Sequence, residues 1–458
     1  MFQVNFVFDF VSSFPDWLIW LSLVLPLASA DIDDLYRELK DETVPEMWTR
    51  GHYLCNRIMD GAEKVAVNTR AYIIPRWTSA GGDARARTFD GDAFANGTNP
   101  FTDQTTVSSI GVSVSFSATE LMQFATRNNK VAVRNFMARY NAGLIDAFKD
   151  HMECWLNAQS NDGIAAILSA EAVTTYTMDS VDDRYGGYLL MDGASYQIIA
   201  SAAFPATIRA TGPYRVLPDG SGLNKRAVPA TVQFAASNGS VAAAITGWAA
   251  EDRVVFFGFG NAGFNSIGYH VGPITGTWQG VSRATPHNRS TRIDGGNNPL
   301  TAALVRRLLA DISKYKGTAN ATSGLIPYCS QEQIVNWLTS AENVTQIRLM
   351  DGSGDGVGEI YDRMLGDVKV NKKAPIVSNR ANPREFRFIR LSDYIWVTMK
   401  DVDFEPNDAG GRLHRQHNAS GDMLSAHSIH IIYHGQLAAR DVSSQGAIVT
   451  LLKPALGE

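Results

Sequence analysis

The chain has 458 residues, of which 45% are hydrophobic and 19% are charged, and its formal net charge is −5. This composition excludes a disordered tail and is typical of a globular protein with buried cores, and the length allows about two to four domains. Without an overall positive charge, tight binding of nucleic acid through its phosphates is not expected to be the main function, although a wall enclosing nucleic acid is allowed.

The first apolar stretch, residues 17–30, ends in small residues as a secretory signal does. However, the first basic residue is Arg37, and Asp9 and Asp16 stand where a signal carries positive charge. The stretch contains Pro26 and is too short to span a bilayer. We therefore expect an ordered or partner-packed apolar arm, with a secretory signal as the second alternative and a membrane anchor as the third.

A long hairpin is predicted after a charged helical segment, residues 32–59. Residues 64–77 have the composition of a strand, residues 78–103 are polar without periodicity, and residues 104–116 alternate like a returning strand. A two-stranded arm is only marginally stable in water, so we expect it to lie on another surface, such as a neighbouring subunit.

A helix of about eight turns is predicted from Asn128 to Asn157, ended by Asn161, Asp162 and Gly163. Its apolar stripe, which we expect to pack on the closing strands of the chain, consists of Val133, Phe136, Met137, Tyr140, Leu144, Phe148, Met152, Trp155 and Leu156. The opposite face is expected to be solvated and carries Arg134, Arg139, Asp146, Lys149, Asp150 and Glu153.

The second half of the chain predicts a β subdomain and two more helices. Strands are expected within residues 230–259, one helix from Asn298 to Lys316, and a short helix through Leu338 that begins with a capping box, Ser330 to Gln333. Closing strands are predicted at residues 367–370, 374–377, 386–391, 394–399 and 429–433.

Three cysteines, Cys55, Cys154 and Cys329, are odd in number and far apart in the sequence. Cys154 lies beside Trp155 in the predicted long helix. We expect buried free thiols in a reducing compartment rather than a disulfide framework or a zinc site.

Residues 258–263 match the pattern G-x-G-x-x-G. A dinucleotide site requires a helix that begins at the third glycine, whereas residues 264–273 have the composition of turn and strand. We therefore expect no cofactor here.

Residues 351–362 place oxygen ligands as an EF-hand loop would, and the candidate calcium ligands are Asp351, Ser353, Asp355 and Asp362. Gly358 replaces the usual aliphatic residue and Asp362 replaces the bidentate glutamate, and neither flank is a clear amphipathic helix. A flexible glycine loop is the favoured interpretation, and calcium binding is the alternative.

Five histidines lie near the end of the chain, namely His414, His417, His427, His430 and His434. On a strand, His430 and His434 share a face that His427 does not, and no carboxylate or cysteine stands at ligand spacing. These are interpreted as strand histidines. Since no nucleophile elbow and no phosphate-binding loop occurs, we expect neither catalytic residues nor a metal or cofactor site.

The order of these elements resembles the major capsid proteins of tailed bacteriophages, the Hong Kong 97 (HK-97) fold, which is of the α+β class. The resemblance is carried by the helix from Asn128 to Asn157 (spine helix), the hairpin of residues 64–116 (E-loop), residues 301–317 with 325–333, and closing strands at 364–377 and 386–393. None of these segments is a fingerprint, so their order carries the resemblance.

The resemblance implies six regions. They are an N-terminal arm (1–60), the E-loop hairpin (61–117), a peripheral domain with the spine helix (118–225), an inserted β subdomain (226–290), an axial domain (291–380) and closing strands of the peripheral and axial domains (381–458). No scaffolding propeptide is expected before the fold.

The function implied by the resemblance is self-assembly, as hexamers and pentamers, into the icosahedral virion shell around a phage double-stranded DNA genome. The shell would form in the host cytoplasm without a membrane and contact DNA without sequence specificity, and scaffold, portal and cement or decoration proteins are further expected partners. The alternatives are an encapsulin-like shell for cargo enzymes and a nucleotide-dependent enzyme.

Some members of this family join subunits by an isopeptide bond from a hairpin lysine. Here no lysine occurs between Lys64 and Lys130, and the cations expected on the hairpin tip are Arg76, Arg85 and Arg87. A guanidinium stays protonated and cannot act as that nucleophile. We therefore expect a shell held together without covalent bonds.

Overall fold

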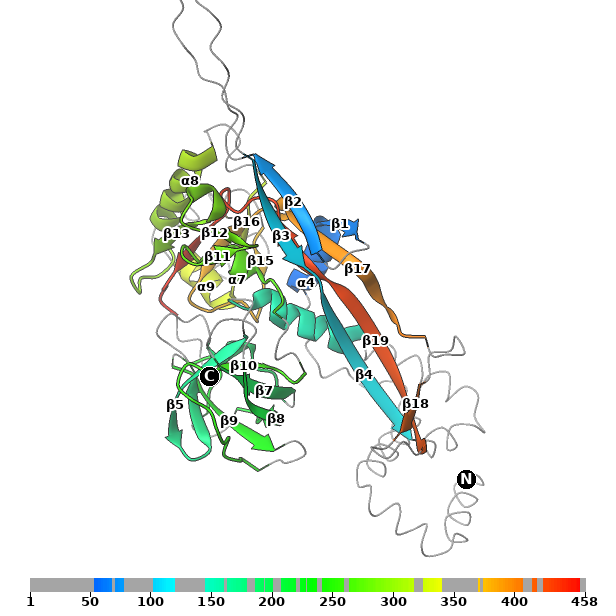
Figure 1. Ribbon diagram of the computed structural model, residues 1–458. Helices are drawn as coiled ribbons and strands as arrows, with labels where there is room; N and C mark the ends of the chain where they lie inside the picture. Colours follow the sequence, from blue (N-terminus) through cyan, green and yellow to red (C-terminus); the bar gives the residue numbers. More distant parts are fainter. Residues whose placement is uncertain are drawn as a thin grey trace, which may run out of the picture. The chain divides into compact units, whose positions relative to one another are not determined.

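The structure is a computed structural model in which helices and a larger number of strands alternate, as expected for the α+β class (Figure 1). It describes residues 53–67, 71–77, 102–119, 145–159, 163–178, 186–192, 194–200, 207–219, 223–227, 229–236, 241–258, 263–316, 324–339, 370, 374–406, 414–417 and 423–453. Two compact units are present, a smaller one of residues 1–50, 113–148 and 402–432 and a larger one formed by the remainder.

In the smaller unit, β18 (His414–His417) pairs antiparallel with β19 (Met423–Ala439). The register shifts once, so that His414 lies opposite Ser428 and His417 opposite Met423. Glu405, which follows β17 (Tyr394–Phe404), donates its backbone N–H to the carbonyl oxygen of His430 at 2.9 Å. The described part of this unit is therefore a strand pair with an adjoining segment.

The larger unit contains a closed barrel whose strands follow the order β10-β5-β6-β9-β8-β7 (Figure 1). They are β5 (Ala165–Ala172), β6 (Thr175–Met178), β7 (Ser195–Ile199), β8 (Ile208–Val216), β9 (Thr231–Ala236) and β10 (Arg253–Phe256). Every pair is antiparallel, and Ile167, Tyr176, Tyr196 and Phe234 are buried.

The barrel differs in extent from the β subdomain expected at residues 226–290. It begins at Ala165, because β10 closes against β5 and β7, which come 50 to 90 residues earlier in the chain. Beyond Phe256 only two short strands precede residue 290, β11 (Thr277–Trp278) and β12 (Val281–Ser282), and these pair with each other.

A five-stranded sheet forms the second core of the larger unit, in the order β13-β20-β16-β14-β15. Its strands are β13 (Thr291–Asp294), β20 (Gly446–Val449), β16 (Phe386–Ile389), β14 (Ile326–Cys329) and β15 (Ile376–Val377). The helix α8 (Ala302–Lys316) lies against β13 and β20, and its Leu308 and Ile312 are buried with Phe386 and Phe388. The predicted helix is therefore present and packs through the predicted face.

The short helix is also present, as α9 (Gln331–Thr339), but not with the predicted capping box. Gln333 Nε2 donates instead to the carbonyl oxygens of Pro383 at 2.7 Å and Leu452 at 3.0 Å. Ser330 Oγ is buried without a hydrogen-bond partner among the described residues. Tertiary contacts have replaced the local cap.

The predicted first strand of the hairpin is divided in two. β1 (Glu63–Ala66) pairs parallel with β17, whereas β2 (Ala71–Trp77) pairs antiparallel with β3 (Thr102–Ser108). The division follows from pairing, since Val67 still donates its N–H to the carbonyl oxygen of Thr398 beside β1. The returning strand likewise becomes β3 and β4 (Ile110–Thr119), and residues 78–101 lie outside the described part.

Residues 145–157 form the described part of the predicted long helix. Phe148, Met152, Trp155 and Leu156 are buried as predicted. Trp155 makes an edge contact with Phe256 of β10, with ring centroids 5.8 Å apart, so this part of the stripe contacts the barrel rather than only the closing strands. The start of the helix and the stripe residues before Phe148 lie outside the described residues.

The prediction that Glu153 lies on a solvated face of this helix is wrong. Its exposed fraction is 0%, as is that of Asn157 one turn later. The helix is covered on this side by α4 (Tyr53–Gly61) and by residues after β15, which the periodicity of a single helix does not reveal.

Candidate functional site

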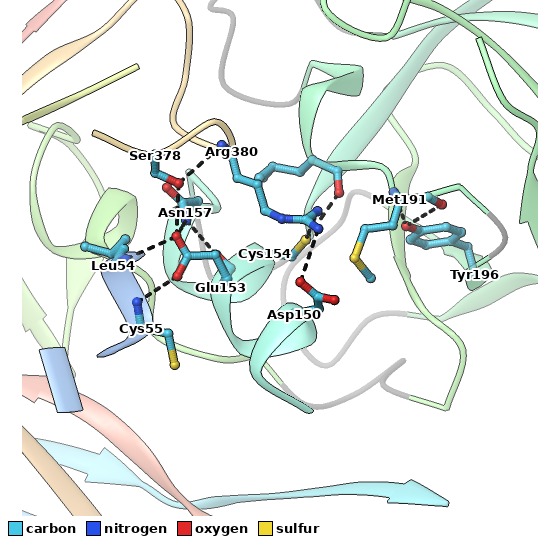
Figure 2. Close-up of polar contacts among 11 residues, drawn as sticks. Leu54, Cys55, Asp150, Glu153, Cys154, Asn157, Met191, Tyr196, Ser378 and Arg380 are labelled. Carbon is cyan, nitrogen blue, oxygen red and sulfur yellow. Dashed lines mark hydrogen bonds and ion pairs between the residues drawn. The ribbon is translucent and has the colours of Figure 1, made fainter. Parts of the chain in front are cut away.

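Figure 2 shows a buried set of polar contacts, here called the Glu153 cluster. It draws together the start of α4, the helix of residues 145–157 and the segment that follows β15. The members in mutual polar contact are Leu54, Cys55, Asp150, Glu153, Cys154, Asn157, Ser378 and Arg380.

Both carboxylate oxygens of Glu153 accept hydrogen bonds. Oε2 accepts from the backbone N–H of Cys55 at 2.7 Å, and Oε1 from that of Leu54 at 3.3 Å. Oε1 also accepts from Ser378 Oγ at 2.9 Å and from Asn157 Nδ2 at 3.1 Å. The first N–H groups of a helix have no partner within the helix, so this carboxylate caps α4 from another element.

Burial raises the pKa of Glu153, and its hydrogen bonds from the Cys55 backbone, Ser378, Asn157 and the Leu54 backbone oppose that shift. These donors all satisfy a carboxylate acceptor at the place where α4 begins. The group therefore acts as a fixed acceptor inside the larger unit.

Arg380 connects the cluster to the other side of the same helix. Its Nη1 lies 2.9 Å from Cys154 Sγ and its Nη2 lies 3.5 Å from Asp150 Oδ1. Burial raises the pKa of the Cys154 thiol to about 12, although Arg380 lowers it. Because the thiolate is the reactive form of cysteine, this geometry is that of a structural thiol rather than a nucleophile.

The cluster also reaches the two cores of the larger unit. Asn157 Oδ1 accepts a hydrogen bond from Tyr328 Oη of β14, and Cys154 Sγ donates to the carbonyl oxygen of Leu189 at 3.5 Å. Leu189 belongs to the 3-10 helix η1 (Gly187–Leu189). The Glu153 cluster thus holds together segments from widely separated parts of the sequence, and this is a structural role.

The three cysteines are buried and free, as predicted. Burial raises the pKa of Cys55 to about 12 and raises that of Cys329 as well. Among the described residues, no group of three or more metal-binding side chains occurs, and no helix is long and apolar enough to cross a membrane. The calcium candidates Asp351, Ser353, Asp355 and Asp362 lie outside the described residues.

The glycine pattern of residues 258–263 follows β10, where Gly258 has a φ of 88°. The expectation of only turn and strand after it is wrong in one respect, because α7 (Ile267–His270) forms one helical turn. Ser266 caps this turn, since its Oγ accepts from the N–H of Tyr269 at 2.9 Å. Residues 259–262 lie outside the described residues, and the absence of a dinucleotide site stays a prediction.

The late histidines lie on strands, as predicted. The rings of His414 and His430 are in edge contact, with centroids 5.0 Å apart. His414 Nε2 lies 2.9 Å from the carbonyl oxygen of Glu405, and His430 Nε2 lies 2.8 Å from Ser428 Oγ. The side chains of His417 and His427 are not among those described.

The base of the hairpin is fixed to its own subunit through one face. Ile74 and Val107 are buried against Ile395, Val397 and Ala438. Successive residues of a strand point to opposite faces, and Ile73 on the other face is 53% exposed. One face of the β2–β3 pair is thus packed, and the other is open among the described residues.

Arg76 also belongs to this anchored base, which corrects its assignment to the reaching tip. Its guanidinium lies over the ring of Trp278 at 4.7 Å. Nη1 donates to Asn288 Oδ1 at 2.5 Å and Nη2 to the carbonyl oxygen of His287 at 2.9 Å. Sequence alone could not show this, because the partners come about 200 residues later; Arg85 and Arg87 lie outside the described part.

No protein-family model and no curated protein matches the sequence. In a comparison of folds, the Cyanophage A-1(L) capsid asymmetric unit matches with a TM-score of 0.52 and 13% identity, over 90% of this chain and 96% of that chain. The capsid of Myoviridae phage XM1 matches with a TM-score of 0.42 and 6% identity, over 89% and 95%. The holo-SrpI encapsulin complex from Synechococcus elongatus matches with 0.39 and 10%, over 91% and 93%.

Of these three structures, the cyanophage capsid alone exceeds a TM-score of 0.5. The similarity extends over nearly the whole of both chains. The chain therefore has the capsid fold predicted from the order of its elements, the HK-97 fold.

Proposed function

We propose that this protein is a major capsid protein, which self-assembles into an icosahedral shell around a double-stranded DNA genome. The observation that carries the proposal is the similarity of fold to a cyanophage capsid over 90% of this chain and 96% of that one. Correspondence over such a length leaves little of this chain for a separate function.

The β2–β3 hairpin supports the proposal physically. Its inner face holds it to the subunit through Ile74 and Val107, while Ile73 on the outer face is 53% exposed. The pair belongs to no larger sheet among the described strands. Such a pair gains stability when another surface covers it, which a neighbouring subunit of a shell would provide.

The Glu153 cluster suits a shell subunit as well. A closed shell requires that every copy present its contact surfaces in the same geometry. Buried polar contacts that are fully satisfied favour one arrangement of the segments they join. The Glu153 cluster joins α4 to the spine helix and to the segment after β15, and so supports a uniform subunit.

Hexamers and pentamers of the chain are the expected assemblies, and scaffold, portal and cement proteins remain expected partners. The shell would be that of the virion, with DNA inside it. An encapsulin-like shell is the alternative from the same fold, and its interior would hold protein.

Electron microscopy of the protein expressed alone tests the proposal. Closed particles are expected, and persistent monomers would contradict a shell function. Coexpression with packaging components should give particles whose nuclease-resistant content is DNA. Particles filled only with a co-purifying enzyme would favour the encapsulin alternative instead.

A further inference from the structure

A pocket of about 310 Å³ lies in the larger unit between α8 and the segment that leads into β13. Figure 1 shows α8 and β13 side by side at one edge of this unit. The polar residues that line the pocket are Arg289, Ser290, Thr291, Arg292, Asp311 and Lys314.

The charge in this pocket is not balanced. Three cations, Arg289, Arg292 and Lys314, face one carboxylate, Asp311. That carboxylate is already paired with Lys314 Nζ at 2.5 Å. Neither arginine side chain has an ion pair or hydrogen bond with any described residue, although both are half-buried.

Other partly buried arginines of the same unit differ in this respect. Arg226 pairs with Glu332, Arg380 with Asp150, and Arg387 with Glu385. Partial burial of a guanidinium without a counter-charge costs free energy, so two such groups at one pocket point to a missing anion.

A second observation marks the same place. The hydroxyl oxygen of Thr291 is buried without a hydrogen-bond partner among the described residues, and Thr291 lines the pocket. A buried hydroxyl in a native protein normally has a partner. Ser290, beside it, is satisfied, because its Oγ accepts from the N–H of Gly272 at 2.8 Å.

We propose that this pocket binds a phosphate group, with Arg289 and Arg292 on its charged oxygens and the Thr291 hydroxyl donating to another. A carboxylate has two oxygens, and a single guanidinium fork is enough to saturate both. Two forks and a hydroxyl match the greater number of oxygens on a phosphate. The source is the phosphodiester backbone of nucleic acid, an assignment that rests on the proposed function as a DNA-enclosing shell; free phosphate is the other source of the same chemistry.

The test measures binding to the full-length subunit before assembly, so its outcome does not depend on shell formation. Two probes are used, inorganic phosphate by titration calorimetry and a fluorescent 20-base-pair DNA duplex by anisotropy at several salt concentrations. The variants are Arg289→Gln with Arg292→Gln, Arg289→Gln alone, and Thr291→Val. The matched control is Arg215→Gln, an exposed arginine of β8 in the barrel.

The double variant should lose phosphate binding, and its salt dependence for DNA should fall by about two in slope, one for each phosphate contact. Arg289→Gln should lower that slope by about one, and Thr291→Val should weaken phosphate binding without changing it. Arg215→Gln should behave as wild type. Thermal unfolding of each variant shows whether it is folded, and the single variants test the proposal if the double variant is not.

Binding of both probes through these residues supports the nucleic acid source, and binding of inorganic phosphate alone supports the free anion. A wild-type subunit that binds neither probe overturns the proposal. So does a double variant that binds both as wild type does. If the double variant keeps its DNA and phosphate binding but no longer assembles, the pocket instead receives an acidic group of a second copy, which also contradicts a phosphate site.

Discussion

The carboxylate of Glu153 accepts a hydrogen bond at 2.7 Å from the backbone N–H of Cys55, 98 residues earlier in the chain. This contact places an acidic group of one helix at the start of another, where the helix dipole favours negative charge. It also explains why Glu153 is buried although it stands among charged residues in the sequence. The start of α4 is thus held by the spine helix rather than by a residue of its own.

Replacing Glu153 by alanine should destabilise the subunit by about 3–5 kcal/mol. The change leaves the N–H groups of Leu54 and Cys55 and the donors of Asn157 and Ser378 without their acceptor. Glu153→Gln keeps an acceptor oxygen and the volume, so it should cost less, roughly 1–2 kcal/mol. Denaturant unfolding of the unassembled subunit measures both.

The control for this series is Glu63→Ala. Glu63 forms an exposed ion pair with Arg440, and such pairs contribute little, so a change within about 0.5 kcal/mol is expected. Equal losses for Glu153→Ala and Glu63→Ala would show that the buried contacts do not stabilise α4.

The larger unit should lose stability in mild acid because of His270. Burial, and then the charge of Arg283, lower the pKa of His270 to about 3, and His270 Nδ1 accepts from Trp278 Nε1 at 2.9 Å. The unfolded chain therefore binds a proton at a pH at which the folded chain does not. Stability is full above pH 6.5 and falls as the pH decreases, by roughly 2 kcal/mol at pH 5.

His151 should contribute in the same direction, because burial lowers its pKa to about 4. Unfolding free energies at pH 7.5 and pH 5 for the wild type and for His270→Gln isolate the His270 effect from carboxyl groups such as Glu153. The variant should lose less stability on acidification than the wild type does. Exposed His287→Gln should lose as much as the wild type, and an identical loss in all three proteins would contradict the assignment to His270.

The sequence predicted elements whose stabilising contacts are local or periodic. The stripe from Phe148 to Leu156 is buried because positions three and four apart share a helix face. The same rule misplaced Glu153, since periodicity cannot show that a second element covers the opposite face. Ser330 and Gln333 likewise matched a local capping pattern, yet Gln333 bonds Pro383 and Leu452, which lie far along the chain.

The barrel and the hairpin base show the same limit. The strand Ala165–Ala172 is rich in alanine and has no strong β signal, and it becomes a strand by pairing with β10 and β6. Arg76 belongs to the hairpin in sequence, but its partners Trp278 and Asn288 come from another part of the chain. In the proposed phosphate pocket, the missing partners of Arg289 and Arg292 are visible only in three dimensions.

Deletion of residues 81–99 should leave a folded subunit that does not form shells. The base of the hairpin would remain anchored by Ile74, Val107 and Arg76, so the core and the thermal unfolding midpoint should change little. Assembly should fail, because the outer hairpin is proposed to lie on a neighbouring subunit. Size-exclusion chromatography separates subunits from particles, and particles of normal size from this variant would refute that role of the hairpin.

Mature particles should contain no covalent links between subunits. Lys64 lies on β1, paired with Trp396 of β17, and no lysine occurs from there to Lys130. The hairpin therefore lacks an amine that could attack a neighbouring side chain. Boiling particles in detergent should release a single band at 49.9 kDa. A ladder of multimers in the gel would show that a lysine elsewhere forms the cross-link.

The central claim is that this chain alone builds a closed shell, and cryo-electron microscopy of the purified full-length protein tests it most directly. The account predicts closed particles with five-fold vertices, in which each subunit contains the six-stranded barrel and the hairpin contacts an adjacent copy. A homogeneous 49.9 kDa monomer that does not assemble under any tested condition of salt, pH or concentration would contradict it.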